Sequence, residues 1–64
     1  MDEENKPYIT VMGAANGKYI AAKMEWDSRQ DGYIATHTGK IRDHYAAAFV
    51  DAVDKAYDEG IEIR

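Results

Sequence analysis

Apolar and polar residues alternate in two neighbouring segments, residues 8–14 and 18–26, which are also rich in β-branched and aromatic side chains. Alternation with a period of two predicts strands that bury one face each. Asn16 and Gly17 lie between the segments, and this dipeptide favours a two-residue turn in which both positions have positive φ. The pattern therefore predicts an antiparallel β-hairpin.

A two-residue turn determines which residues face each other across the hairpin, because it pairs Ala15 with Lys18. The inner, buried face then holds Ile9, Val11, Gly13, Ile20, Ala22 and Met24. The outer face holds Tyr8, Thr10, Met12, Ala14, Tyr19, Ala21, Lys23 and Glu25. We expect Trp26 on the inner side at the end of the second strand, where its ring would close the core; alternatively, Trp26 anchors an interface.

Beyond the hairpin, residues 27–32 are polar and turn-forming, and residues 33–37 alternate again. So short a connection predicts a third strand that lies antiparallel to the second and completes a meander. We expect Ile34 to join the inner face. The outer face then receives Tyr33, Ala35 and His37.

From residue 40 to residue 59 the apolar period changes to 3.6, which predicts a helix. Its buried stripe would comprise Ile41, Tyr45, Ala48, Phe49, Ala52, Val53 and Ala56. Thr38 is the expected N-cap, and Asp43 would lie near the positive end of the helix dipole. Gly60 is expected to end the helix, because glycine readily adopts the left-handed conformation found at that position.

Residues 61–64 alternate once more and predict a short fourth strand, with Ile61 and Ile63 docked under the helix. The element order predicts an α+β fold, a two-layer sandwich. In it, one helix packs on one face of an antiparallel three-stranded meander, and the short fourth strand runs parallel to the first. Residues 1–6 are expected to form a flexible N-terminal lead-in, and residues 7–64 a single α+β domain.

In topology this order resembles the first half of ribonuclease H-like folds and some small ribosomal-protein domains, and the resemblance covers nearly the whole chain. It implies the layout of the elements and not a function. The nuclease family carries a metal-binding acidic residue on its first strand, whereas residues 8–14 contain none. The ribosomal domains are basic, whereas this chain is acidic.

The chain has 64 residues and a formal net charge of -4, from 12 acidic and 8 basic side chains. This charge argues against a nucleic-acid binder that works by neutralising phosphates. Cysteine is absent, which excludes disulfides and cysteine zinc sites and fits a cytoplasmic protein. The apolar runs are too short for a membrane span or a signal peptide, so we expect no membrane partner.

Two segments look like ligand-binding loops but lack the residues that the chemistry needs. Residues 13–19 resemble a phosphate-binding loop, yet the spacing is one residue short and Tyr19 replaces the hydroxyl residue that would hold magnesium. Residues 27–38 resemble a calcium loop, yet Arg29 stands at its third position and Thr38 at the twelfth, where a bidentate Glu is required. We therefore expect ordinary turns in both segments.

The sequence supports a catalytic site no better than it supports a ligand-binding loop. His37, His44 and Asp43 could approach each other where the third strand meets the helix and bind zinc weakly, but a zinc-signature spacing is absent. For nucleophilic catalysis, nothing marks a hydroxyl with a base and an orienting group beside it. We therefore expect no enzyme, and no catalytic, metal-binding or cofactor-binding residues.

One helix can cover only one face of the sheet, which leaves the outer face open. We expect Tyr8, Met12, Tyr19 and Tyr33 to bind a partner there, because tyrosine and methionine are enriched in interface cores. The occupant would be another protein or a second copy of the chain in a homodimer. Alternatively, the tyrosines only complete a half-buried sheet. They could also stack on nucleic-acid bases, but the positive groove that this requires is missing.

A second candidate surface lies on the exposed side of the helix and at its exit, where Asp51, Asp54, Asp58, Glu59 and Glu62 gather around Lys55. Asp54 and Asp58 repel each other across one helical turn, and Asp58 and Glu59 lie at the negative end of the helix dipole. These acids therefore oppose local stability. They either form a solvated face that maintains solubility, or they dock on a basic groove of another protein.

Together these features predict a small, non-catalytic, acidic protein-binding module. The leading hypothesis is an inhibitor or regulator of a larger protein, of the phage-type, anti-defence or nucleic-acid-mimicking kind. It would use the tyrosine-rich sheet face and the acidic helix face. A nucleic-acid or small-ligand binder is the alternative from another class, and a small metal-dependent enzyme comes last.

Overall fold

The computed structural model describes residues 5–64, so residues 1–4 of the predicted lead-in lie outside the described residues. The elements are β1 (Tyr8–Ala14), a 3-10 turn (Ala15–Gly17), β2 (Lys18–Asp27), β3 (Gly32–Thr38), α1 (Tyr45–Glu59) and β4 (Glu62–Ile63). The sheet has the order β3-β2-β1-β4, with β1, β2 and β3 antiparallel and β4 parallel to β1. The predicted α+β fold is confirmed.

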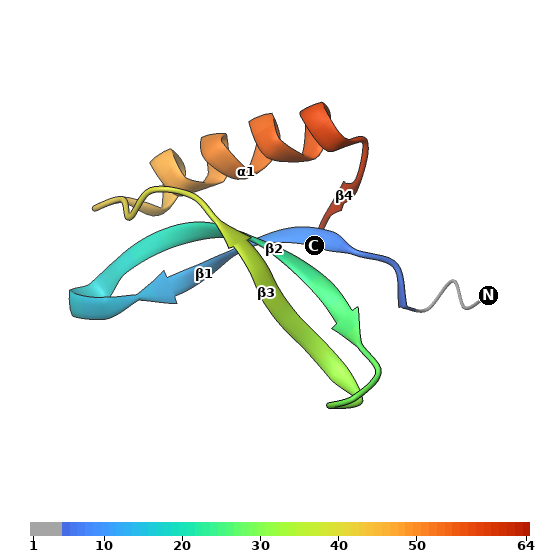
Figure 1. The fold of residues 1–64 in the computed structure, drawn as a ribbon. Helices are drawn as coiled ribbons and strands as arrows, with labels where there is room; N and C mark the ends of the chain where they lie inside the picture. Colours follow the sequence, from blue (N-terminus) through green and yellow to red (C-terminus); the bar gives the residue numbers. More distant parts are fainter. Residues whose placement is uncertain (1–4) are drawn as a thin grey trace.

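Helix α1 lies across β1 and β2 and also contacts β4, so it covers one face of the sheet, here called the helix side. Figure 1 shows that the hairpin end of β2 and β3 extends away from α1. The opposite sheet face, here called the open face, is covered by no helix of residues 5–64.

The turn between β1 and β2 has three residues instead of the expected two. Asn16 and Gly17 have positive φ values of 61° and 72°, as the sequence predicts, but Ala15 also belongs to the turn. Ala14 therefore lies opposite Lys18, and the predicted pairing of Ala15 with Lys18 is wrong. A shift of one residue moves every side chain of one strand to the other face.

The shift exchanges the two faces of β2. Tyr19, Ala21 and Lys23 share the helix side with Ile9 and Val11 of β1. The residues Tyr8, Thr10, Met12, Ile20, Ala22, Met24 and Trp26 share the open face. The predicted inward orientation of Ile20, Ala22, Met24 and Trp26 is therefore wrong, as is the outward orientation of Tyr19, Ala21, Lys23 and Glu25.

Strand β3 follows the prediction up to an irregularity. Tyr33 lies opposite Trp26, and Ala35 lies opposite Met24, so both belong to the open face as expected. The register then shifts between Lys23 and Met24, because Thr36 is an extra residue in β3. His37 consequently pairs with Lys23 on the helix side, and its predicted outward position is wrong.

The core is small and consists mainly of alanine. Its buried residues are Ile9, Ala21, Ala22, Ala48, Ala52 and Ala56. Val11 and Ile61 pack against the part of it between β1, β2 and α1. Three alanines at every fourth helix position let α1 lie close to the sheet, and Ile9 is the one large side chain that is fully buried among residues 5–64.

Helix α1 begins five residues later than predicted, at Tyr45, because the preceding segment is extended. The Tyr19 amide donates to the Arg42 carbonyl at 2.8 Å, and the Arg42 amide donates to the Tyr19 carbonyl at 2.7 Å. This pairing keeps the chain alongside β2. Thr38 therefore ends β3, and His44 takes the N-cap position in its place. The predicted end at Gly60 is confirmed by its φ of 68°.

Candidate protein-binding surfaces

The open face carries a cluster of three aromatic rings, one from each of the strands β1, β2 and β3. The Tyr8 and Tyr33 ring centroids lie 4.9 Å apart, and those of Trp26 and Tyr33 lie 5.3 Å apart. Both pairs are edge-to-face, which is a favourable arrangement for aromatic rings. Each of the three residues is half-buried, so part of each side chain remains exposed.

Polar groups at the edge of the cluster hold these rings in place. The Tyr33 hydroxyl donates to the Lys6 carbonyl at 2.9 Å. The Arg64 guanidinium lies 4.7 Å from the centre of the Tyr8 ring, a cation–π contact. Arg64 in turn donates to Glu62 at 2.5 Å, and this hydrogen bond raises the pKa of Arg64. Contacts within the chain therefore orient the rings of this cluster.

The structure brings together three of the four partner-binding residues predicted on the sheet. Tyr8, Met12 and Tyr33 lie on the open face. Tyr19 lies on the helix side, where its ring centroid is 5.6 Å from that of Tyr45 in α1, so its predicted place among them is wrong. Trp26 takes a place on this face instead, because the three-residue turn turns it away from the helix side.

The predicted acidic surface is partly neutralised within the chain. Arg42 donates to both carboxylate oxygens of Asp51, at 2.7 and 3.0 Å, and this contact lowers the pKa of Asp51. Lys23 donates to Glu59 at 2.5 Å and lowers its pKa in the same way, with Lys55 3.5 Å from the same carboxylate.

Glu62 is likewise paired, with Arg64, but Asp54 and Asp58 differ from these acids. Asp54 and Asp58 lie on the exposed side of α1 and have no ion-pair partner within residues 5–64. Asp51 and Glu59 thus have structural roles. Asp54 and Asp58 remain the acids that could meet a partner.

One flank of α1 is apolar and exposed, contrary to the predicted buried stripe. Only Ala48, Ala52 and Ala56 of that stripe are buried. The exposed fractions are 54% for Tyr45, 41% for Phe49 and 41% for Val53, and Ile41 lies before the helix at 58%. Because alanines bring α1 so close to the sheet, only a narrow stripe fits beneath it.

The flank beside the alanine stripe is here called the apolar flank and comprises Phe49, Val50, Val53 and Tyr57. Val50 is 57% exposed and Tyr57 is 87% exposed. The spacing of Phe49, Val53 and Tyr57 at every fourth residue is a signal for such a second stripe. The sequence contains this signal, but the alanine stripe beside it repeats at the same spacing. The pattern therefore does not show which of the two stripes is buried.

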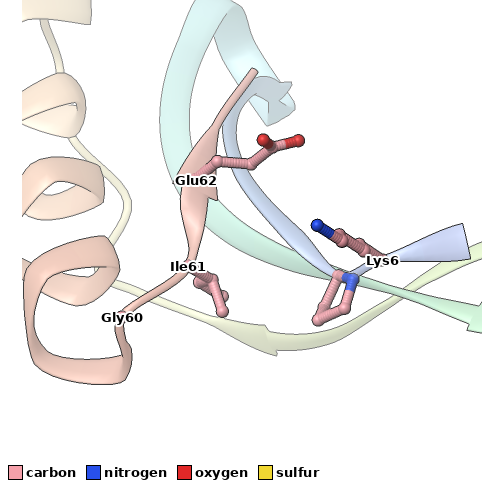
Figure 2. A pocket seen from close by; sticks show the side chains of 5 residues that line it. Lys6, Gly60, Ile61 and Glu62 are labelled. Atoms are coloured by element: carbon pink, nitrogen blue, oxygen red, sulfur yellow. The ribbon is translucent and has the colours of Figure 1, made fainter. Parts of the chain in front are cut away.

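A shallow pocket of about 260 Å³ lies beside β4 and is lined by Lys6, Pro7, Gly60, Ile61 and Glu62. Figure 2 shows the Lys6 and Glu62 side chains extending toward each other across it. The volume is below the range of about 300–1,000 Å³ that is typical of small-molecule sites. The pocket is therefore a weaker candidate site than the open face.

The two histidines have different surroundings. The His37 ring is 3.3 Å from the Thr36 hydroxyl, and His44 precedes the first turn of α1 without a side-chain capping bond. The neighbouring Asp43 pairs with Lys18, which lowers its pKa. Within residues 5–64, no three His, Asp or Glu side chains are grouped so that they could hold a metal ion.

Comparison with known proteins finds no match to the chain among protein families, curated proteins or solved structures. In residues 5–64, α1 is too short and too polar to span a bilayer.

Proposed function

We propose that this chain is a non-catalytic, acidic protein-binding module that acts as an inhibitor or regulator of a larger protein. The open face is its main contact. The observation that carries the proposal is the cluster of Tyr8, Trp26 and Tyr33, held edge-to-face on a sheet face that α1 does not cover. Met12, which is 40% exposed, extends the same surface along β1.

The composition of this surface favours a protein as its partner. Tyrosine, tryptophan and methionine are enriched in the cores of protein interfaces, where they contribute large contact areas at a small entropic cost. The ring contacts and the Tyr33–Lys6 hydrogen bond order the surface in advance, which reduces the entropy lost on binding. The net charge of -4 would steer the chain toward a basic partner, with Asp54 and Asp58 available for a second contact.

A binder that stacks nucleic-acid bases or a small ligand on the rings is the second candidate, supported by Arg64 beside Tyr8. This candidate needs positive charges beside the rings that are free to bind phosphates. Lys23, which the sequence places next to the tyrosines, lies on the helix side and is bound to Glu59. Arg64 is itself paired with Glu62. A protein partner therefore remains the better supported reading.

Affinity capture with two charge-matched variants tests the proposal. Ala35→Arg places a cation on the open face between Met24 and Tyr33, whereas Gln30→Arg places the same charge in the exposed turn between β2 and β3. We expect the wild type and Gln30→Arg to retain the same protein from cells of the source organism, and Ala35→Arg to lose it. Equal retention by both variants would contradict the proposal.

A fluorescence titration distinguishes the second candidate. Trp26 lies in the ring cluster, so a base or small ligand stacked there would change its emission. We expect no change with single-stranded oligonucleotide at low salt. A saturable change in the emission would favour the nucleic-acid or small-ligand alternative.

A further inference from the structure

The side of α1 that faces away from the sheet is uncovered. Figure 1 shows α1 as the outermost layer, with no other element of residues 5–64 beyond it. Successive residues of a helix are about 100° apart, so their order around α1 follows from their numbers. Beside the alanine stripe lies the apolar flank, and beyond the flank lie Asp54 and Asp58. Asp51 comes next and reaches Arg42.

Two neighbouring rows of exposed side chains run along this uncovered side, because residues four apart in a helix lie one above the other. The first row is apolar throughout and consists of Phe49, Val53 and Tyr57. The second row begins apolar and ends acidic, and consists of Val50, Asp54 and Asp58. Such rows leave a groove between them, here called the α1 groove. A row of side chains from another helix packs into a groove of this kind.

The acidic end of the second row lacks a counter-charge in the described part of the chain. Asp54 and Asp58 make no ion pair within residues 5–64, and they repel each other across one helical turn. Lys55 is the one cation of α1, and its ammonium lies 3.5 Å from the Glu59 carboxylate. A cation that balances Asp54 and Asp58 would therefore have to come from a partner.

We propose that the α1 groove docks an amphipathic helix of a partner protein, with Lys or Arg residues four apart beside its apolar row. Four residues advance a helix by about 6 Å. Cations at this interval on the partner would match the interval between Asp54 and Asp58, while the apolar row of the partner packs into the groove. This contact would be the second one of the proposed protein-binding module, so the inference rests on that function and gives its partner a class.

Charge selects among the occupants of the α1 groove. A second copy of the chain would bring the same two acids and a net charge of -4. Nucleic acid and the anionic surface of a membrane are repelled for the same reason. An extended peptide binds by pairing with the edge of a sheet, which a helix does not offer. A basic amphipathic helix combines the apolar row and the positive charge that the groove requires.

The length of the groove determines how strong the contact can be. From Phe49 to Asp58 it extends about 14 Å along the helix axis. A contact of this length buries less area than a standard protein interface, which is typical of transient complexes. We therefore expect an affinity in the micromolar range.

Fluorescence anisotropy with synthetic peptides at about 0.15 M salt tests the proposal. The probe is a labelled peptide of about 18 residues, long enough to form a helix, with Leu on one face and Lys on both sides of that face. One control peptide has Glu in place of Lys. The other is a scrambled version of the probe, which keeps the charge but loses the apolar face. We expect saturable binding of the probe and about tenfold weaker binding, or less, of both controls.

A matched pair of variants tests the apolar part of the groove. Val50→Ser makes a residue of the groove polar where the exposed fraction is 57%, and Ile41→Ser makes a similar change outside the groove at 58%. Because both side chains are largely exposed, both variants should fold. We expect Val50→Ser to weaken probe binding about fivefold and Ile41→Ser to leave it unchanged.

A second pair tests the charges. Asp54→Asn with Asp58→Asn removes two acids beside the groove, whereas Asp27→Asn with Asp31→Asn removes two at the turn between β2 and β3. Both double variants change the net charge equally. We expect the first to weaken probe binding about tenfold and the second by less than about twofold, because charge pairs act at short range in salt.

Reversal of the two charges adds a measurement that requires a gain of binding. Asp54→Lys with Asp58→Lys should bind the Glu-containing control peptide and lose the basic probe. The variant should fold, since cations are favourable toward the end of a helix. Failure of this exchange, equal binding of the scrambled peptide, or unchanged affinity in Val50→Ser would each overturn the inference.

The open-face variant Ala35→Arg separates this inference from the proposed function. It should bind the probe as the wild type does, because position 35 lies on the opposite side of the sheet from α1. If the wild type does not bind the probe, but Ala35→Arg still loses the captured protein, the inference about the α1 groove is wrong and the open face remains supported.

Discussion

Arg42 holds Asp51 through two hydrogen bonds, from Nε at 2.7 Å and from Nη2 at 3.0 Å. The contact joins the extended segment before α1 to the second turn of the helix. It explains how a helix without a side-chain N-cap bond is positioned at its start. The Asp51 carboxylate, which the sequence places among the acids that could bind a partner, is therefore paired within the chain.

Asp51→Asn should lower the melting temperature by a few degrees, because a two-point, charge-assisted contact becomes a weaker neutral one. Asp54→Asn is the matched control, since it removes the same charge one turn away. It should leave the melting temperature unchanged or raise it slightly, because Asp54 repels Asp58. Thermal unfolding followed by circular dichroism measures both. Equal effects would show that Arg42 contributes nothing through Asp51.

Stability should fall in mild acid. Lys18, Arg42 and Lys23 lower the pKa values of Asp43, Asp51 and Glu59, whose ordinary values are 3.8 for Asp and 4.5 for Glu. A carboxyl with a lowered folded-state pKa contributes stability above its unfolded value and loses it as the pH falls through the folded one.

Urea unfolding should therefore show a midpoint that is nearly constant from about pH 7 to about pH 5 and declines below the ordinary Glu value of 4.5. The double variant Asp51→Asn with Glu59→Gln should be less stable at neutral pH and decline less steeply. An identical acid profile in the double variant would assign the loss to other groups.

Ile9→Ala should remove a large share of the free energy of unfolding. The loss of a buried Ile side chain costs about 2–5 kcal/mol, while a chain of this length has a total stability of about 3–10 kcal/mol. Ile41→Ala makes the same truncation at a position that is 58% exposed, and should change stability by less than about 0.5 kcal/mol. Chemical denaturation of the two variants compares them. A small effect at Ile9 would show that the core is not between β1 and α1.

Gly17→Ala should destabilise the hairpin by about 1 kcal/mol, since Gly17 has a φ of 72° and alanine is strained there. Gly32→Ala is the control, because Gly32 has no positive φ and its nearest contact for an added Cβ is 3.9 Å away. That variant should be neutral. Denaturant midpoints of the two proteins measure the difference. If both substitutions were neutral, the left-handed turn would not exist in solution.

The elements and their order follow from local patterns. Alternation identifies β1, β2 and β3, and the 3.6 period identifies the helix, because each pattern reflects which side chains one element can bury. The Asn16-Gly17 pair and Gly60 mark chain reversals through φ values that few other residues tolerate. These signals depend only on neighbours in the sequence, so they are readable without a fold.

The candidate surface could be predicted only in part. Tyr8, Met12 and Tyr33 belong to it as expected, but the places of Tyr19 and Trp26 depend on one residue of turn length. Asn-Gly permits a two-residue or a three-residue turn, and packing against α1 selects between them. The pairing of Asp51 with Arg42 likewise requires a segment that only tertiary contacts keep extended.

By itself, then, the sequence determines an α+β chain with a hairpin, a third strand, one helix and a short parallel strand. Tertiary structure decides which face of β2 meets the helix, where the helix begins, and which apolar stripe stays exposed. The reason is that periodicity shows that a strand or helix has an apolar side, but not which distant element that side packs against. Contacts between distant residues decide this, such as those of Tyr19 with Arg42 and of the α1 alanines with Ile9.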